Sequence, residues 1–337
     1  MTEERSTAGP GTGAQDGFMP RKLPAGLKEY RGLYLKSIES PENFWRAQAA
    51  RIKWDRTFTA VVNENIPEGH VEWFVDGTLN AFGNAIVRPI EDGSGGRNAV
   101  VYVDVSGKVR SLTYQELHDA SVSFSNALAS AGLKAGDRFM FYLPDSPEAV
   151  IAMLACARMG VVAVPVPVRY TAELVREIAA NCDAAGILLA SGNDSRSYSA
   201  RAAAVVDAFK GKTAIDAGGE PIEGTTKFAD FLSGGTGNAP CPSFDAEHPL
   251  FILYANSAAG VPRGSVFATG GYLVQAAASC DYFFRSPVNG GGATCIVCAL
   301  DLASAAGQCY GLWGPLANGM TIVIAARGLE SQADRYR

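Results

Sequence analysis

From residue 111 onward, short apolar runs alternate with helix-length amphipathic segments, and this alternation restricts the fold more than any other feature of the chain. The apolar runs are residues 139–143, 161–166 and 186–190. Helices are predicted to begin after Thr113, Ser146 and Thr171, because a hydroxyl at that position accepts hydrogen bonds from free backbone amides. Strands and helices that alternate at this spacing predict parallel βαβ units, with helices on both faces of a sheet.

A second series begins after a loop rich in glycine, proline and serine at residues 233–243. Its predicted elements are strands at 249–254, 294–299 and 320–325, a loop at 255–264, and helices at 271–284 and 303–316. Three strands make an unusually small parallel sheet, which would leave an edge and an apolar face in need of cover. We therefore expect two α/β units, of which the second is incomplete.

The first 110 residues are less regular. Residues 1–22 contain few apolar side chains and are expected to be disordered, because they cannot bury a core. The predicted organisation has four parts: a disordered tail at 1–22, an N-terminal segment at 23–110, a first α/β subdomain at 111–243 and a partial second one at 244–337.

Composition and charge exclude several classes of partner. The formal net charge is −5, and 47% of the residues are hydrophobic. This charge cannot neutralise a nucleic acid backbone or an anionic membrane surface. The most apolar stretch, residues 295–326, is interrupted by polar and helix-breaking residues, so no membrane-spanning segment is predicted. We expect a globular protein that binds neither nucleic acid nor membrane.

Cysteine and histidine usage gives no sign of a metal site. Seven cysteines are scattered through the chain without a secretory leader, so a reduced, cytoplasmic protein is expected. Cys295 and Cys298 have the spacing of a redox or zinc pair, but without a second pair they are interpreted as core residues of a strand. His70, His118 and His248 are far apart in sequence, and neither a metal site nor a catalytic triad is predicted.

Several ordered motifs carry a resemblance to a known family. They are residues 44–45 (FW), 73–80 (WFVDGTLN), 112–117 (LTYQEL), 147–160 (PEAVIAMLACARMG), 249–254 (PLFILY), 269–274 (TGGYLV) and 314–319 (GPLANG). Over residues 30–325 the chain resembles the adenylate-forming acyl-CoA synthetases, most closely the AMP-forming acetyl-CoA synthetases. The resemblance implies two stacked parallel-sheet α/β/α subdomains, as in the large domain of those enzymes, with the second incomplete and no C-terminal lid domain.

The phosphate loop departs from the family pattern. The family activates a carboxylate with ATP and passes the acyl group to coenzyme A, and its loop reads close to YTSGSTGKPKG. Residues 254–264 read YANSAAGVPRG, so that three alanines replace hydroxyl residues and Val261 replaces the first lysine. Amides, hydroxyls and a lysine are the groups that hold a leaving pyrophosphate. The resemblance therefore implies a turn that has lost its ligands. The candidate residues of this degenerate loop are Tyr254, Asn256, Ser257, Gly260, Arg263 and Gly264, of which Ser257 and Arg263 could still contribute contacts to an anion.

The acyl-pocket segment is also altered. The family segment resembles ADVGWVTGHSY, and residues 300–310 read LDLASAAGQCY. The candidate pocket residues are Asp301, Ser304, Ala306 and Gly307. Ser304 replaces the tryptophan that limits the acyl pocket, so a pocket here would be wider than one for acetate; small residues equally favour close helix packing. A single carboxylate at a strand end, such as Asp301, is typical of a helix cap.

Coenzyme A recognition in the family draws on arginines after the third strand of the first sheet. Arg196 and Arg201 lie in that neighbourhood, although their altered spacing also fits solvated surface charges. Three later parts of the family have no counterpart before Arg337: a Thr-Glu segment for adenine and magnesium, a ribose-binding aspartate, and a C-terminal domain with a catalytic lysine.

Two functional hypotheses follow from the resemblance. In the first, the chain is a catalytically inactive acetyl-CoA synthetase-like pseudoenzyme, a structural or regulatory subunit of a larger enzyme complex. It uses no cofactor or metal, and another subunit or a second copy covers the incomplete second sheet. In the second, it is an acyl-CoA ligase component, or an acyl- or nucleotide-binding component, that binds ATP or coenzyme A while another polypeptide supplies the missing catalytic parts. Fold alone does not decide between them.

Overall fold

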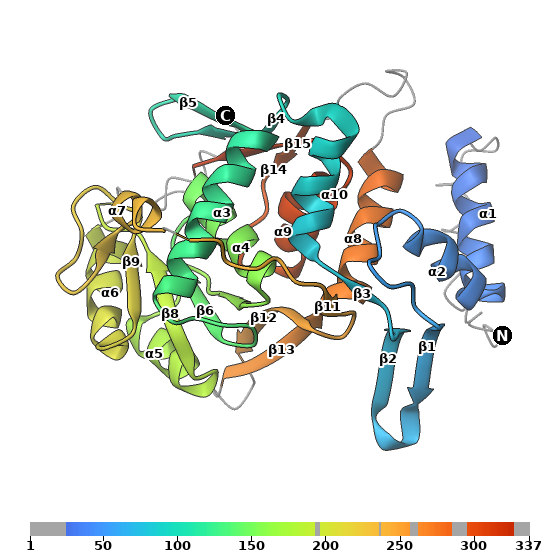
Figure 1. Cartoon of the computed structure of the whole chain (residues 1–337), viewed down its shortest axis with the longest axis horizontal. Helices are drawn as coiled ribbons and strands as arrows, with labels where there is room; N and C mark the ends of the chain where they lie inside the picture. The colour runs from blue at the N-terminus through green and yellow to red at the C-terminus, as the bar shows by residue number, and fades with distance from the viewer. Residues whose placement is uncertain (1–24, 193–195, 236, 257–261, 285–294, 327–337) are drawn as a thin grey trace, which may run out of the picture. The chain divides into compact units, whose positions relative to one another are not determined.

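The computed structural model describes residues 25–192, 196–235, 237–256, 262–284 and 295–326 (Figure 1). Two compact units divide the chain, Met1–Ala47 and Gln48–Arg337. The first unit contains α1 (Ala25–Glu39) and most of α2 (Pro41–Ala49), in which Phe44 and Trp45 pack edge to face. The tail predicted to be disordered, residues 1–22, lies outside the described residues.

The described residues form four sheets, of which β1-β2 and β11-β3 have only two strands each. The larger of the other two has seven strands, in the order β10-β9-β8-β6-β7-β12-β13. Their bounds are β10 Thr226–Lys227, β9 Thr213–Asp216, β8 Ala184–Leu189, β6 Arg138–Tyr142, β7 Val162–Pro165, β12 Pro249–Asn256 and β13 Pro262–Ala268. Neighbouring strands from β10 to β12 are parallel, and β13 is antiparallel to β12. The predicted parallel sheet is confirmed.

Helices cover both faces of this sheet, as the alternation predicts. They are α3 Tyr114–Ser130, α4 Pro147–Met159, α5 Ala172–Asn181, α6 Arg196–Val206 and α7 Phe228–Ser233. On one face, Met140 and Tyr142 of β6 share a buried cluster with side chains of α5 and with Tyr198 of α6. On the other face, Phe139 contacts Phe124 of α3, with ring centroids 6.4 Å apart. The alternation of side chains along β6 therefore supplies both cores.

The predicted helix starts at Thr113, Ser146 and Thr171 are confirmed. Each hydroxyl accepts a hydrogen bond from the backbone amide three residues later. Thr113 also forms a capping box, because its own amide donates to the Glu116 carboxylate at 2.8 Å. Gly160 ends α4 in the left-handed conformation (φ 74°), which glycine adopts without steric cost.

The second sheet corrects the assignment made from the sequence. Its strands are, in order, β14 Cys295–Cys298, β15 Thr321–Ala325, β4 Asn98–Val103 and β5 Val109–Thr113. Residues 249–254, predicted to open this sheet, belong to β12, which instead pairs with β7 of the larger sheet. The N-terminal segment supplies β4 and β5. The prediction was wrong because periodicity identifies a strand but carries no information about its distant partner.

Three consecutive helical segments replace the single helix predicted at 303–316. They are α9 Ala305–Gln308, the π-helical η6 Cys309–Trp313 and α10 Gly314–Ala317, and they pack with α8 (Thr269–Phe284). Trp313 is almost fully buried, and its Nε1 donates to Oε1 of Gln308 at 2.9 Å.

The remaining elements are β1 Ala60–Asn65, η1 Ile66–Glu68, β2 His70–Val75, β3 Thr78–Leu79, η2 Gly83–Val87, η3 Ile90–Ser94, η4 Asp207–Phe209 and β11 Phe244–Asp245. Within the described ranges, every helix is too short or too polar to cross a bilayer.

Candidate functional site

The carboxyl ends of strands from both sheets meet at three charged residues. Asp145 follows β6 and accepts a hydrogen bond from the backbone amide of Leu302, which follows β14, at 3.1 Å. Arg169, after β7, lies 3.9 Å from the carboxylate of Asp301. Open α/β sheets bind their ligands outside the carboxyl ends of their strands. This junction is therefore the candidate functional site.

Asp301 and Ser304 both shape the turn that enters α9. The Asp301 carboxylate accepts a hydrogen bond from the Ala303 amide at 2.8 Å. The backbone carbonyl oxygen of Asp301 accepts a second one from the Ser304 hydroxyl at 2.6 Å. Ser304 is the residue that caps α9, because its Oγ accepts from the Gly307 amide at 3.0 Å. The sequence-based interpretation of Asp301 as a helix cap is thus corrected. The Asp301 side chain stabilises an Asx turn that precedes the capping residue of α9.

One of the small residues in this segment, Gly307, serves close packing. Ala306 is exposed, whereas Gly307 is buried. A Cβ atom on Gly307 would lie 1.9 Å from the carbonyl oxygen of Asp301, so the turn needs a residue without a side chain here. This contact favours the packing alternative for Gly307 over the pocket alternative.

The described phosphate-loop candidates lie on the antiparallel strands β12 and β13, which form a hairpin. β12 continues to Asn256 and β13 begins at Pro262, so residues predicted as a loop are partly strand, with Tyr254 opposite Gly264. Arg263 is exposed. Ser257, Gly260 and the side chain of Asn256 lie outside the described residues.

Tyr254 points into the core below this hairpin. Its side chain is only 7% exposed, it belongs to the same buried cluster as Tyr142, and its hydroxyl donates to Oδ1 of Asn181 at 2.6 Å. A Cβ atom on Gly264 would lie 3.0 Å from the Tyr254 ring, so the glycine leaves room for the ring across the hairpin. Packing alone therefore explains why these two loop residues match the family pattern.

Burial of Tyr254 predicts a pH-dependent contribution to stability. Desolvation raises the pKa of its hydroxyl to about 12, above the ordinary value near 10.0. Between these values only the unfolded chain releases the proton, so the wild type should lose stability relative to Tyr254→Phe as the pH rises from about 10 to 12. Denaturant unfolding of both proteins across this range measures the difference. A difference that stays constant would contradict the burial argument.

Of the two coenzyme A candidates, the structure describes the side chain of Arg201. Arg201 donates to the carbonyl oxygen of Val168 at 3.0 Å and to the Tyr142 hydroxyl at 3.3 Å, so it braces the segment after β7. Arg196 begins α6, and its side chain lies outside the described residues. The solvated-charge alternative is wrong for Arg201, because its guanidinium is partly buried against these acceptors.

Sequence reasoning missed Asp145 and Arg169. Asp145 follows the predicted strand at 139–143 by two residues, so a search for polar residues at strand ends could have found it. Arg169 follows the predicted strand at 161–166 by three residues, so the same search could have found it, but its proximity to Asp301 of the second sheet has no signal in the sequence. The Cys295 and Cys298 side chains face opposite sides of β14, one exposed and one buried. Searched over the described residues only, clusters of His, Cys, Asp and Glu suited to a metal ion are absent.

Comparison with known proteins identifies the family. The two sheets and their meeting strand ends define an α/β protein of the class that binds ligands at such junctions. Residues 91–336 match the family model described as AMP-binding enzyme, and residues 30–85 match that of the acetyl-coenzyme A synthetase N-terminus. The chain belongs to the AMP-binding enzyme family, and the resemblance drawn from the sequence motifs is confirmed.

Relatives of this family are about twice as long as the chain. Acetyl-coenzyme A synthetase from Mycobacterium bovis is 34% identical over 322 residues, which cover 90% of this chain and 48% of the relative. The enzyme of the same name from Parvibaculum lavamentivorans is 31% identical, covering 88% of this chain and 47% of the relative. Acetoacetyl-CoA synthetase from Streptomyces lividans has the same fold, with a TM-score of 0.75 at 21% identity over 88% of this chain and 46% of its own. The chain thus spans about half the length of these proteins.

Proposed function

We propose that this protein is a non-adenylating member of the AMP-binding enzyme family that acts as a structural or regulatory subunit of a larger assembly. One observation carries the proposal: the segment that resembles the phosphate loop contains Ala255, Ala258, Ala259 and Val261 where the family has three hydroxyl residues and a lysine. Methyl and isopropyl groups neither donate hydrogen bonds to phosphate oxygens nor offset their charge.

The size of the loss supports this proposal. A hydrogen bond to a charged group contributes roughly 1.5–3 kcal/mol, so the loss of three or four removes on the order of 5 kcal/mol or more. That amount corresponds to roughly several thousandfold in rate or affinity. Two of the residues that match the pattern, Tyr254 and Gly264, have a packing role that needs no ligand. We accordingly assign the protein no nucleotide, coenzyme or metal of its own.

A partly exposed apolar face of the second sheet supports a role in assembly. Val297, Val323 and Val101 lie side by side on β14, β15 and β4; Val297 is 71% exposed, and Val323 and Val101 are half-buried. Ile296, Ile322 and Val100 form the buried row on the other face of the same strands. Parallel sheets are normally covered on both faces, usually by helices. A partner polypeptide that presents an apolar helical layer is therefore the proposed occupant.

The protein purified alone is expected to self-associate through this face, because exposed apolar patches drive association. Val297→Lys should shift most of the material to the monomer. Val266→Lys is the matched control, since Val266 is a valine of similar exposure (59%) on the outer strand of the larger sheet, and it should leave the assembly unchanged. Light scattering after gel filtration measures the mass. A stable monomeric wild type would contradict the proposal.

A buried thiol supports a reducing location. Cys156 is a free, buried cysteine, and burial raises its pKa well above the usual value, so its thiol is protected from reaction. Disulfides are rare in the cytoplasm, where thiols stay reduced. We place the protein there as part of the same proposal.

A second candidate function rests on the junction of strand ends. Asp145, Arg169 and Asp301 keep polar groups at the position where α/β proteins bind ligands. The chain would then bind ATP, AMP, coenzyme A or an acyl-CoA, and another polypeptide would complete the catalytic site. Isothermal titration calorimetry with these four ligands separates the candidates: binding at millimolar concentration favours the second, and its absence removes it.

A further inference from the structure

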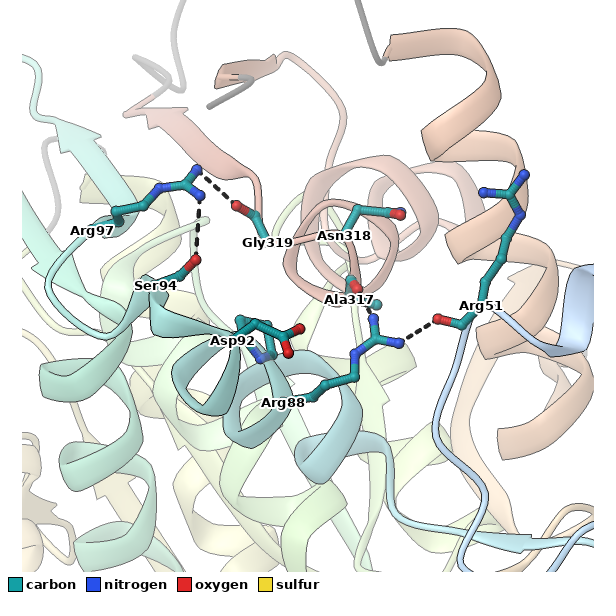
Figure 2. A pocket seen from close by; sticks show the side chains of 9 residues that line it. Arg51, Arg88, Asp92, Ser94, Arg97, Ala317, Asn318 and Gly319 are labelled. Atoms are coloured by element: carbon teal, nitrogen blue, oxygen red, sulfur yellow. Dashed lines mark hydrogen bonds between the residues drawn. The ribbon is translucent and has the colours of Figure 1, made fainter. Parts of the chain in front are cut away.

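A pocket lined by three arginines lies away from the candidate site. Its volume is about 380 Å³, and its lining includes Arg51, Arg88, Arg97, Asp92 and Ser94 together with the turn after α10. Arg97 immediately precedes β4, and the turn at 317–319 leads into β15, so the pocket lies at the amino ends of these parallel strands. The candidate functional site lies at their carboxyl ends. Figure 2 shows the arginine side chains around this pocket.

Two of the guanidinium groups are held by neutral acceptors. Arg88 donates to the backbone carbonyl oxygens of Arg51 and Ala317, and Arg97 donates to the Gly319 carbonyl oxygen at 2.9 Å (Figure 2). Arg97 also contacts the Ser94 hydroxyl at 3.3 Å. Carbonyl and hydroxyl oxygens satisfy hydrogen bonds but carry no net charge. The positive charges of Arg88 and Arg97 are therefore not neutralised by these bonds.

Arg51 and Asp92 complete the charge balance. Arg51 forms an ion pair with Asp281, which offsets its charge. Among the described lining residues the one acid is Asp92, which is exposed. The lining thus retains about one net positive charge, and partial burial of Arg88 lowers the pKa of its guanidinium because the charge is poorly solvated there.

Capping of α10 explains only part of this arrangement. Arginine side chains commonly hydrogen-bond the last carbonyl groups of a helix, and the bonds to Ala317 and Gly319 fit that role. The Nε of Arg88, however, is buried and has no hydrogen-bond partner among the described residues. A buried donor without an acceptor costs free energy, so the capping role leaves the Arg88 guanidinium incompletely satisfied.

We propose that this pocket binds a phosphate group of a small molecule or inorganic phosphate through Arg88 and Arg97. Two guanidinium groups can contact the oxygens of one phosphate, a geometry that arginine favours. The site is independent of the proposed function, because it shares no residue with the phosphate-loop hairpin or with the exposed face of the second sheet. The proposal that adenylation is lost and the proposal that this pocket binds phosphate can therefore be refuted separately.

Isothermal titration calorimetry with inorganic phosphate and with pyrophosphate, at matched ionic strength against sodium chloride, tests the proposal. The wild type should bind at least one of them at millimolar concentration. Arg97→Gln should weaken the affinity by about tenfold, because a charge-assisted hydrogen bond is lost. Asp92→Asn should strengthen it by up to about fivefold, because a nearby negative charge is removed. Arg176→Gln, a surface arginine on α5, is the matched control and should change nothing.

The two pocket variants are expected to change the anion affinity in opposite directions. The unchanged affinity of Arg176→Gln then distinguishes a specific site from general attraction of anions to surface arginines. Asp92 is exposed, so Asp92→Asn tests the site even if Arg97→Gln weakens the fold, which circular dichroism would reveal. No heat of binding from either anion in the wild type would overturn the proposal. So would equal affinities for the wild type and the Asp92→Asn protein.

Discussion

The purified protein is expected to release no pyrophosphate from ATP in the presence of acetate or longer carboxylates. Relative to an acetyl-coenzyme A synthetase with an intact phosphate loop, the rate should be lower by roughly several thousandfold or more, because about 5 kcal/mol of phosphate contacts is missing. A carboxylate-dependent pyrophosphate release assay, with the intact enzyme as the positive control, measures this ratio. A rate within about tenfold of that enzyme's rate would contradict the proposed loss of adenylation.

A restored loop gives the matched comparison. The variant carrying Ala255→Thr, Ala258→Ser, Ala259→Thr and Val261→Lys returns the hydroxyls and the ammonium group that the family pattern contains. Calorimetry should detect ATP binding to this variant and none to the wild type. Val261→Met is the control, since it lengthens the side chain without adding charge. Equal ATP affinity in the wild type and the restored variant would refute the argument from lost ligands.

Gly307→Ala is expected to destabilise the fold by about 3 kcal/mol, because the added methyl group meets backbone atoms rather than a movable side chain. Its Cβ would lie 1.9 Å from the carbonyl oxygen and 2.6 Å from the carbonyl carbon of Asp301. The turn that connects β14 to α9 would have to open, and with it the hydrogen bonds of Ser304. Denaturant unfolding monitored by circular dichroism gives the change in the free energy of unfolding.

Gly83→Ala is the matched control for this substitution. Gly83 is also a helical glycine, but a Cβ atom there would meet only Asn80, at 3.7 Å. Alanine is the better helix former, so the change should be neutral or stabilise the protein by up to about 1 kcal/mol. If both variants unfold at the same denaturant concentration as the wild type, the close packing assigned to Gly307 is refuted.

Local features of the sequence predicted most of the secondary structure. The capped helix starts at Thr113, Ser146 and Thr171 and the strand at 139–143 were confirmed, because caps and apolar periodicity depend on residues only a few positions apart. The family resemblance was confirmed for the same reason, since its motifs are continuous stretches of chain. Comparison with the family pattern identified Tyr254 and Asp301 as candidate site residues. It did not predict which side chains they contact in the folded protein, such as Asn181 for Tyr254 and Arg169 for Asp301.

The sequence by itself determined that the chain builds parallel βαβ units and that its phosphate-loop segment lacks the family's hydroxyls and lysine. Only the tertiary structure decided that β12 joins the larger sheet, that the N-terminal segment completes the second one, and that Arg88 and Arg97 share a pocket with a turn more than two hundred residues away. The physical reason is that hydrogen bonds within helices and caps form between neighbours in the chain. Strand partners and side-chain contacts are selected among distant segments by the burial of the whole core.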